Sequence, residues 1–359
     1  MRPAPRPTHS TRPKSRARPT RLAPLAAALA LAACLPEPAP ETLRISGETM
    51  GTTYSVTAVA PPDTIAEDAL QSRVEAALAE VNATMSNWDP GSEISRFNAA
   101  ATTDPQPVSP DLHALMTLAA EVHDLSGGRF DVTVAPLIDL WGFGPRTPDT
   151  PVPDAAALEA ARAAVGQAAM LTLGDGTLAK ARPDVTANLS AIAKGWGVDR
   201  VAATLRAAGI DDYLVEIGGE IVAAGTNAEG APWRIGIERP DAGTGTVERV
   251  VDLRDAGLAT SGDYRNYVEQ DGVRLSHIID PVTARPIAHR TASVTVIADT
   301  AARADALATA LLVADSETAR AIAAAHDIAA FLLVREGDGF AAFETDAFSR
   351  YAADGETGE

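Results

Sequence analysis

The sequence predicts an α+β protein built from antiparallel sheets with packed helices. Short strand-like segments follow one another in its second half, and strands joined by short turns pair antiparallel. The dipeptide Asp271-Gly272 separates two such segments, and Asp-Gly is a strong hairpin signal. Segments with helical spacing are grouped between the strands rather than alternating with them, which disfavours a βαβ fold.

The first half of the chain is predicted to hold one broken strand, four helices and one hairpin. Thr, Val and Tyr alternate with other residues over 44–60, and MGTTY interrupts this strand. Gly174-Asp175-Gly176 predicts a hairpin over 171–181. Apolar residues at helical spacing predict helices over 63–84, 112–125, 155–165 and 196–208.

The second half is rich in strands, which are expected at 213–225, 233–240, 247–254 and 293–299. With the turn at Asp271-Gly272, residues pair where their numbers sum to about 543, so His277 lies opposite about Asn266. The same geometry brings residues 260–263 near 280–283. Two polar corners at one end of a sheet indicate a candidate site.

The segment AARADALATALL, residues 301–312, predicts a buried helix because apolar residues lie on nearly every side. Asp299 or Thr300 offers an N-cap. Asp305 and Thr309 lie four residues apart and therefore share one face. An unpaired buried carboxylate costs several kcal/mol or becomes protonated. Asp305 is therefore expected to face a positive charge.

The first 34 residues predict an export signal. A basic segment without acidic residues precedes a short apolar run that ends in Leu31-Ala32-Ala33-Cys34, which resembles a bacterial lipobox. Cys34 is then a lipidated residue that holds the protein on a membrane surface without spanning it. The alternative is an ordinary signal peptide with an incidental cysteine. Cys34 is the sole cysteine, so no disulfide is expected.

The domain organisation follows from this leader. Residues 35–43 are expected to form a tether, 44–350 one domain of two closely joined lobes, and 351–359 a C-terminal tail. Seven of the 30 Lys and Arg residues lie in the leader, which leaves 23 against 48 Asp and Glu, a net charge near −25. This charge argues against binding of nucleic acid or an anionic lipid surface.

Each sequence motif alone is weak evidence for a function, but the order of the motifs along the chain is specific evidence. WGFGP lacks the full dinucleotide-binding fingerprint, and no P-loop or HExxH pattern occurs. Taken together, eight collinear segments resemble the ApbE family, the FAD:protein FMN transferases, over essentially all of the chain after the leader. The segments include MSNWDPGSEISRFN, SGGRFDVTVAPLIDLWGFG, NLSAIAKGWGVDR, YLVEIGGEI, ATSGDYRNY, SHIIDPVTARP and ADALATAL. The resemblance implies an ApbE-like, T-fold-like architecture.

The resemblance also implies a reaction. The family splits FAD with a divalent cation, usually Mg²⁺ (Mn²⁺ or Ca²⁺ are alternatives), and transfers FMN to a Thr or Ser hydroxyl of a target redox protein, releasing AMP. It implies His277 as the base for that hydroxyl and Asp305, Thr309 and the Ala191 carbonyl as metal ligands. The implied FAD contacts are Met50, Trp88, Phe130, Asp131, Asn188, Lys194 and Ile279.

The chemistry supports these assignments. Splitting a pyrophosphate requires charge neutralisation and alignment, and a hard cation with oxygen ligands supplies both. Lys194, near the start of a helix, adds a point charge to helix amides that favour phosphate. Asn188 departs from the family pattern, which usually has Asp there; Asn keeps an acceptor oxygen but loses the charge.

Three alternatives stay open from the sequence. Water in place of the acceptor hydroxyl gives an FAD pyrophosphatase, a site without turnover gives an FAD-binding lipoprotein, and a generic solute-binding lipoprotein needs no metal-facing Asp305. With the leader, the leading interpretation is a lipid-anchored transferase at the periplasmic face of the bacterial cell envelope, expected on the inner membrane. Its partners are then FAD and exported or membrane redox proteins.

Overall fold

The computed structural model describes residues 40–59, 65–143, 152–240, 246–263, 267–270 and 273–353, together with Met1 and Ala4. Cys34, Asn266 and the Asp271-Gly272 turn lie outside these residues. Residues Pro40–Glu359 form one compact unit. Among the described helices, none combines the length and the apolar composition that crossing a membrane requires.

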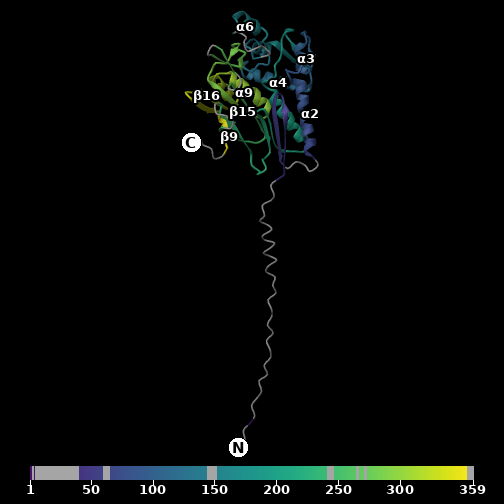
Figure 1. The fold of residues 1–359 in the computed structure, drawn as a ribbon, viewed down its shortest axis with the longest axis vertical. Coiled ribbons are helices and arrows are strands. Elements are labelled where there is room, and N and C mark those ends of the chain that lie inside the picture. The colour runs from purple at the N-terminus through teal and green to yellow at the C-terminus, as the bar shows by residue number, and fades with distance from the viewer. Residues whose placement is uncertain are drawn as a thin grey trace. The chain divides into compact units, whose positions relative to one another are not determined.

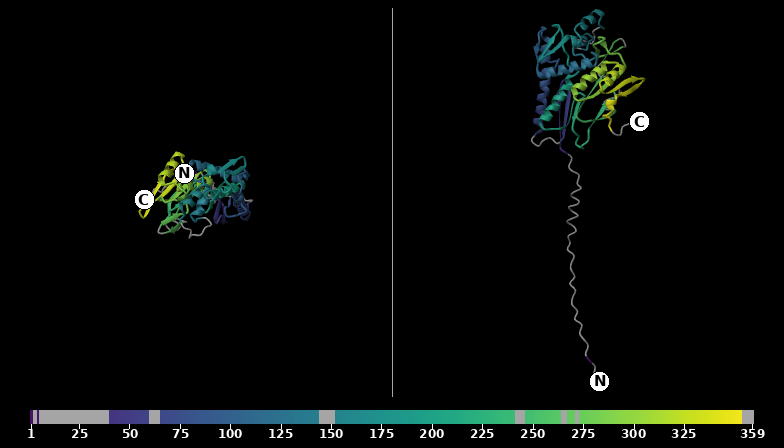
Figure 2. Two further views of the ribbon diagram at one scale, coloured as in Figure 1. Left: turned by 90° about the horizontal axis from the view of Figure 1, so that it is seen from above. Right: turned by 180° about the vertical axis from the view of Figure 1, so that it is seen from behind.

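An eight-stranded antiparallel sheet organises the described chain, which confirms the predicted α+β class. Its strand order is β1-β2-β6-β7-β10-β15-β16-β17. Figure 2 shows the early strands and α2 on one side of this unit and the C-terminal strands on the other. The strands are β1 (Thr42–Thr49), β2 (Thr52–Val59), β6 (Asp212–Ile217), β7 (Glu220–Ala224), β10 (Ala256–Gly262), β15 (Thr291–Ala298), β16 (Ala329–Glu336) and β17 (Gly339–Glu344).

Nine further short strands form four small sheets in the described chain. The three-stranded one contains β3 (Gln106–Pro107), β5 (Thr177–Lys180) and β4 (Leu171–Gly174), as the predicted hairpin over 171–181 requires. The others pair β8 (Trp233–Glu238) with β9 (Val247–Leu253), β11 (Tyr267–Gln270) with β12 (Val273–Ser276), and β13 (Ile279–Asp280) with β14 (Arg285–Pro286).

The helices are amphipathic or fully buried, and most begin at a residue whose side chain caps them. Ser109, Asp154, Thr300 and Asp315 each accept a hydrogen bond from a backbone N–H of the first turn. The helices are α2 (Glu67–Met85), α3 (Glu93–Ala99), α4 (Pro110–Leu125), α5 (Ala135–Leu140), α6 (Ala155–Arg162), α7 (Gln167–Met170), α8 (Ala193–Ala207), α9 (Ala301–Val313), α10 (Ser316–Ala325) and α11 (Asp346–Ser349).

The predicted break inside 44–60 is confirmed as a tight turn between two strands, and 213–225, which was predicted as one strand, is also divided by a tight turn. Met50 (φ 50°) and Gly51 (φ 74°) reverse the chain inside 44–60, and Gly218 (φ 57°) and Gly219 (φ 101°) reverse it inside 213–225. Left-handed backbone at two successive residues makes a hairpin turn. The first prediction also placed the strand start too late, since β1 begins at Thr42, within the predicted tether.

The predicted register of the β11–β12 hairpin is confirmed. Tyr267 pairs with Ser276 and Gln270 with Val273, as the turn position required. At the end of the chain, Ala352 bridges Val251 and Ala353 is buried. Residues 351–353 therefore pack on the domain, although the sequence placed them in a tail.

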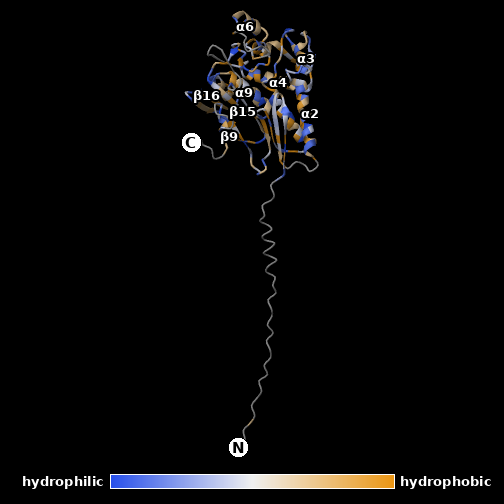
Figure 3. Cartoon of the chain, viewed as in Figure 1, coloured by the Kyte–Doolittle hydropathy of each residue, from blue (hydrophilic) through white to orange (hydrophobic). Residues whose placement is uncertain are grey.

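Helices cover one face of the large sheet, and the β8–β9 hairpin covers the other (Figure 1). Val294 and Val296 of β15 pack with Leu307 of α9, whereas Ile297 packs with Trp233 of β8. Because both faces are covered, nearly every residue of β15 is buried. Figure 3 shows hydrophobic residues concentrated on these inner elements, while α2 carries hydrophilic residues as well.

The start of α9 is held by α8 at very close range. Asp199 of α8 accepts hydrogen bonds from the backbone N–H groups of Ala301 and Ala302, both at 2.9 Å. A Cβ atom on Gly195 would lie 2.4 Å from the Ala301 carbonyl oxygen. A Cβ atom on Gly257 of β10 would lie 2.3 Å from the Ala301 nitrogen. Glycine at these positions therefore permits α8 and β10 to reach the backbone of α9.

Gly195→Ala is expected to destabilise the fold. The added methyl group meets backbone rather than a flexible side chain, so α8 and α9 must separate, and overpacking of this kind costs about 1–3 kcal/mol. Urea denaturation measures the free energy of unfolding. Gly339→Ala is the control, because the nearest atom to its Cβ is 4.0 Å away. Equal stability of the two variants would contradict the close packing of α8 on α9.

Candidate functional site

One cavity of about 410 Å³ collects most of the predicted site residues. This volume lies in the range of small-molecule sites. The two polar corners predicted to meet, 260–263 and 280–283, line it in part: residues 260–262 of β10 and Pro281 do so, beside the adjoining segment 277–279. They meet through tertiary packing, because β10 pairs with β7 and β15. The predicted residues in the lining are Phe130, Asp131, Asn188, Ala191, Lys194, His277, Ile279, Asp305 and Thr309.

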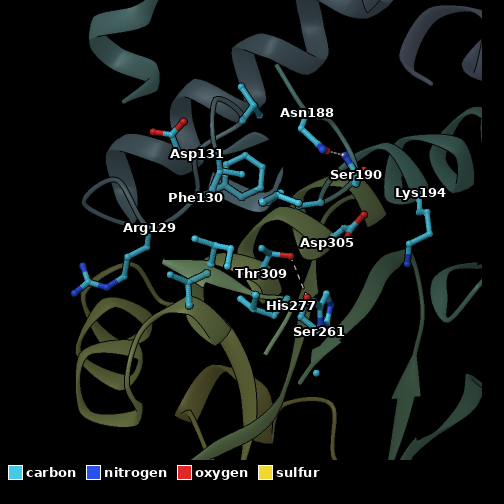
Figure 4. Close-up of a pocket in the computed structure, with 18 of the residues that line it drawn as sticks. Arg129, Phe130, Asp131, Asn188, Ser190, Lys194, Ser261, His277, Asp305 and Thr309 are labelled. Carbon is cyan, nitrogen blue, oxygen red and sulfur yellow. Dashed lines mark hydrogen bonds between the residues drawn. The ribbon is translucent and has the colours of Figure 1, made fainter. Parts of the chain in front are cut away.

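Helix α9 carries Asp305 and Thr309 into the cavity on one face, as predicted (Figure 4). The Asp305 side chain is nearly buried, and its Oδ2 accepts a hydrogen bond from the Gly195 N–H at 3.1 Å. The Thr309 hydroxyl lies 3.1 Å from the Ser261 hydroxyl of β10. Each oxygen is therefore fixed by a second element, α8 or β10, and not by α9 alone.

Lys194 lies in the first turn of α8, and its ammonium forms an ion pair with Glu220. The Nζ–Oε1 distance is 2.5 Å. Lys194 remains partly exposed, whereas Glu220 is 3 % exposed. Glu220 is the first residue of β7, directly after the Gly218-Gly219 turn. The sequence interpretation missed it, although a carboxylate adjoining two glycines in a strand was a visible signal.

Burial is the largest influence on the pKa values of Glu220 and Asp305. It raises the pKa of Glu220 to about 8, with a further rise from the Asp305 carboxylate and an opposing effect of Lys194. Burial also raises the pKa of Asp305, against the effects of Lys194 and of the Gly195 N–H. Two buried carboxyl groups thus lie in the field of one ammonium group, that of Lys194, so this part of the cavity favours an additional positive charge or a proton.

Asn188 lies in a loop that is held by hydrogen bonds from two other asparagines. Asn87 and Asn98 both donate to the Ala187 carbonyl at 2.8 Å, and the Leu189 N–H donates to the Asn87 Oδ1 at 2.8 Å. The Asn188 Oδ1 accepts from the Ser190 N–H at 2.9 Å. This loop leads into Ala191 and Lys194, so Asn87 and Asn98, which sequence reasoning did not single out, help to place the cavity wall.

Asp131 uses its carboxylate to shape the loop that it occupies. Its Oδ1 accepts hydrogen bonds from the backbone N–H and the hydroxyl of Thr133, and its Oδ2 accepts from the Gln167 N–H at 2.8 Å. In Figure 4 this carboxylate points away from Asp305 and Thr309. Asp131 therefore contributes to the cavity chiefly by fixing the backbone beside Phe130, which is itself buried.

His277 enters the cavity from the segment between β12 and β13. Its ring makes an edge contact with Phe143, with ring centroids 6.5 Å apart. Ile279, buried in β13, adds an apolar wall nearby. Figure 4 draws His277 together with Ser261 and Thr309 among the residues that line the cavity. A base and the candidate cation ligands therefore share one cavity.

Met50 and Trp88 are not among the residues that line the cavity. Met50 packs against α8, where its Cε lies 2.8 Å from the position of a Cβ on Gly197. Trp88 is 81 % exposed and follows Asn87, the residue that fastens the Asn188 loop. Their predicted contacts with FAD stay predictions.

The donor set fits a hard divalent cation. Asp305 and Glu220 offer carboxylate oxygens, Thr309 offers a hydroxyl, and Ala191 lines the same cavity. Within the described residues, no group of three or more His, Cys, Asp or Glu side chains forms a complete metal site. A cation here would therefore rely on mixed oxygen donors and on the phosphates of a ligand, as Mg²⁺ commonly does.

Comparisons with known proteins agree with this geometry. The ApbE family profile matches residues 50–332. The FAD:protein FMN transferase of Vibrio cholerae is 44 % identical over 330 residues, which cover 92 % of this chain and 98 % of that protein. The structure of the flavin transferase ApbE from Vibrio cholerae superposes with a TM-score of 0.80 at 43 % identity, over 87 % of this chain and 99 % of that one.

A second solved structure, the apo form of the Pseudomonas stutzeri flavinyl transferase ApbE, has a TM-score of 0.81 at 40 % identity. It covers 89 % of this chain and 99 % of its own. Sequence and fold agree over nearly the whole described chain, and the chain belongs to the ApbE family.

Proposed function

We propose that this protein is an FAD:protein FMN transferase that moves the FMN part of FAD onto a Thr or Ser hydroxyl of a target redox protein. The observation that carries the proposal is that Asp305, Thr309, Lys194 and His277 line one cavity. The hydroxyl oxygen attacks the phosphorus of the FMN half, a P–O bond forms, and the bond to AMP breaks. AMP leaves with the bridging oxygen.

The chain's own residues supply alignment and charge for this step. His277 accepts the proton of the attacking hydroxyl, which makes the oxygen a better nucleophile. Lys194 places a positive charge beside the pyrophosphate and stabilises the negative charge that grows on the leaving phosphate. Phe130 and Ile279 provide apolar surface, which suits the rings of a flavin nucleotide.

A divalent cation, Mg²⁺ with Mn²⁺ or Ca²⁺ as alternatives, would neutralise phosphate charge here. Asp305, Thr309 and the Ala191 carbonyl would hold it. The buried Asp305 carboxyl supports this assignment: burial raises its pKa, and a bound cation would stabilise the ionised form.

The decisive experiment incubates the purified protein with FAD, Mg²⁺ and an exported redox domain and measures the intact mass of that domain. A covalent FMN adduct, formed together with AMP, is expected. Rapid AMP release without any acceptor would instead indicate an FAD pyrophosphatase. Tight FAD binding with no AMP under all conditions would indicate an FAD-binding lipoprotein, and either result would overturn the proposed transfer.

Asn188→Asp is expected to preserve the rate of FMN transfer or raise it by up to severalfold. Aspartate keeps the oxygen that accepts from the Ser190 N–H and adds a negative charge to the wall of the cavity that holds the candidate cation ligands. Initial rates of adduct formation at several Mg²⁺ concentrations measure the effect. A large loss of rate would show that the amide at this position is required.

The protein is further proposed to be lipid-anchored through Cys34 at the periplasmic face of the inner membrane. The lipobox-like sequence supports this, as does the first strand beginning at Thr42, shortly after Cys34. Its substrates are then FAD and exported or membrane redox proteins. Membrane fractionation of the full chain and of Cys34→Ser tests the anchor; a membrane-bound Cys34→Ser protein would contradict it.

A further inference from the structure

Glu220 is a buried acidic residue to which the proposed reaction assigns no role. It begins β7, lines the cavity and is 3 % exposed. Glutamate is rarely buried to this degree unless a partner compensates its charge. It lies beside Lys194 in the cavity, so the partners of its two carboxylate oxygens indicate what this part of the cavity can bind.

The two carboxylate oxygens of Glu220 differ. Oε1 accepts a hydrogen bond from the Lys194 ammonium. Oε2 is fully buried and has no hydrogen-bond partner in the part of the chain that the structure describes. Buried polar atoms are nearly always paired, so an orphaned carboxylate oxygen in the wall of a ligand cavity indicates a partner that arrives with the ligand.

The charges at this corner point to a cation as that partner. Glu220 and Asp305 line the same cavity, and Lys194, which forms an ion pair with Glu220, is the cation whose charge also acts on Asp305. Removing two carboxylates from water against one ammonium is unfavourable. A divalent cation reverses this balance and prefers carboxylate oxygens.

We propose that Glu220 is a second acidic residue of the cation site, in which Oε2 binds the cation directly or through one of its waters while Lys194 holds Oε1. The proposal rests on the proposed metal-dependent function. It extends the site from α9 to the large sheet, because β7 contributes a cation contact. The Gly218-Gly219 turn explains how: it places the first residue of β7 directly at the cavity.

The test measures binding of Mn²⁺ to the purified full chain by electron paramagnetic resonance, alone and with ADP as a pyrophosphate-bearing probe. Glu220→Gln keeps an oxygen for Lys194 and removes the charge. We expect its Mn²⁺ affinity to fall by about 10-fold or more. Glu216→Gln is the matched control, because Glu216 lies in the same hairpin outside the cavity and accepts from the Gly219 N–H. Its affinity should change less than about twofold.

Asp305→Asn separates this inference from the proposed function. If Asp305→Asn loses Mn²⁺ and Glu220→Gln binds it like the parent protein, the role of Glu220 is overturned and the cation site stands. If the parent protein binds no Mn²⁺ with or without ADP, the metal-dependent function fails and this inference fails with it.

Thermal unfolding gives a second reading that does not depend on activity. Without metal, Glu220→Gln should melt at or above the temperature of the parent protein, because a buried charge has been removed. Added Mn²⁺ should then raise the melting temperature of the parent protein more than that of the variant. Equal gains would overturn the proposal.

A second variant serves if Glu220→Gln fails to fold. Glu220→Asp moves the carboxylate back by one methylene and should also weaken Mn²⁺ binding. Unchanged Mn²⁺ affinity of Glu220→Asp would refute the contact.

Discussion

Asp305→Ala is expected to abolish metal-dependent FMN transfer, with a loss of roughly 10²–10³-fold or more. Asp305 is the one carboxylate that α9 presents to the cavity, and its Oδ2 is held in position by the Gly195 N–H. Its removal takes away both a cation ligand and the charge that attracts the cation. Adduct formation by intact mass and release of AMP measure the loss.

The variant should remain folded. Alanine suits a helix interior, and a buried charge disappears, although the Gly195 N–H loses its acceptor at a cost of about 1–3 kcal/mol. Asp305→Asn retains an acceptor for that N–H and should show the same loss of transfer with less destabilisation. Asp299→Asn changes an exposed residue two positions before the same helix and should behave as the parent protein. Full activity of Asp305→Ala would rule out the metal assignment.

His277→Ala is expected to slow FMN transfer by about 10²–10⁴-fold, the usual contribution of a general base. The imidazole lies in the same cavity as the candidate cation ligands and is the base assigned to the acceptor hydroxyl. Because the variant keeps Asp305, Thr309 and Lys194, its affinity for FAD should change little. Flavin fluorescence measures that affinity, and adduct formation measures transfer.

The role of His277 is separated from FAD activation by a second assay. Slow AMP release without acceptor, in which water attacks, should be reduced far less than transfer if His277 serves the acceptor hydroxyl. Equal loss in both assays would place His277 on the FAD side instead. His326→Ala, an exposed histidine at the end of α10, is the control and should leave both rates unchanged.

Local patterns in the sequence were sufficient to predict much of the candidate site. The spacing of Asp305 and Thr309 predicted their common face, because helix periodicity is a local property. The Asp271-Gly272 turn predicted the register of β11 with β12, because a turn fixes the pairing of the strands that flank it. The periodic segments predicted α4 and α9 within two residues of their observed ends.

One local prediction failed for a physical reason. The sequence predicted the break inside 44–60, which the turn at Met50-Gly51 confirms, but it predicted 213–225 as a single strand, because the alternation of side chains continues on both sides of the turn. Only the left-handed backbone at Gly218-Gly219 divides that segment. Glycine permits that conformation without requiring it, so composition could not decide between a turn and a close backbone approach.

The sequence by itself determined the fold class, the family and the groups that α9 and the start of α8 bring to the cavity. Only the tertiary structure decided which other groups join them. Glu220 reaches Lys194 because β7 lies beside α8, and Asp199 caps α9 from about a hundred residues away. Such contacts depend on strand order and on close packing at Gly195, and the periodicity of the local sequence predicts neither of these.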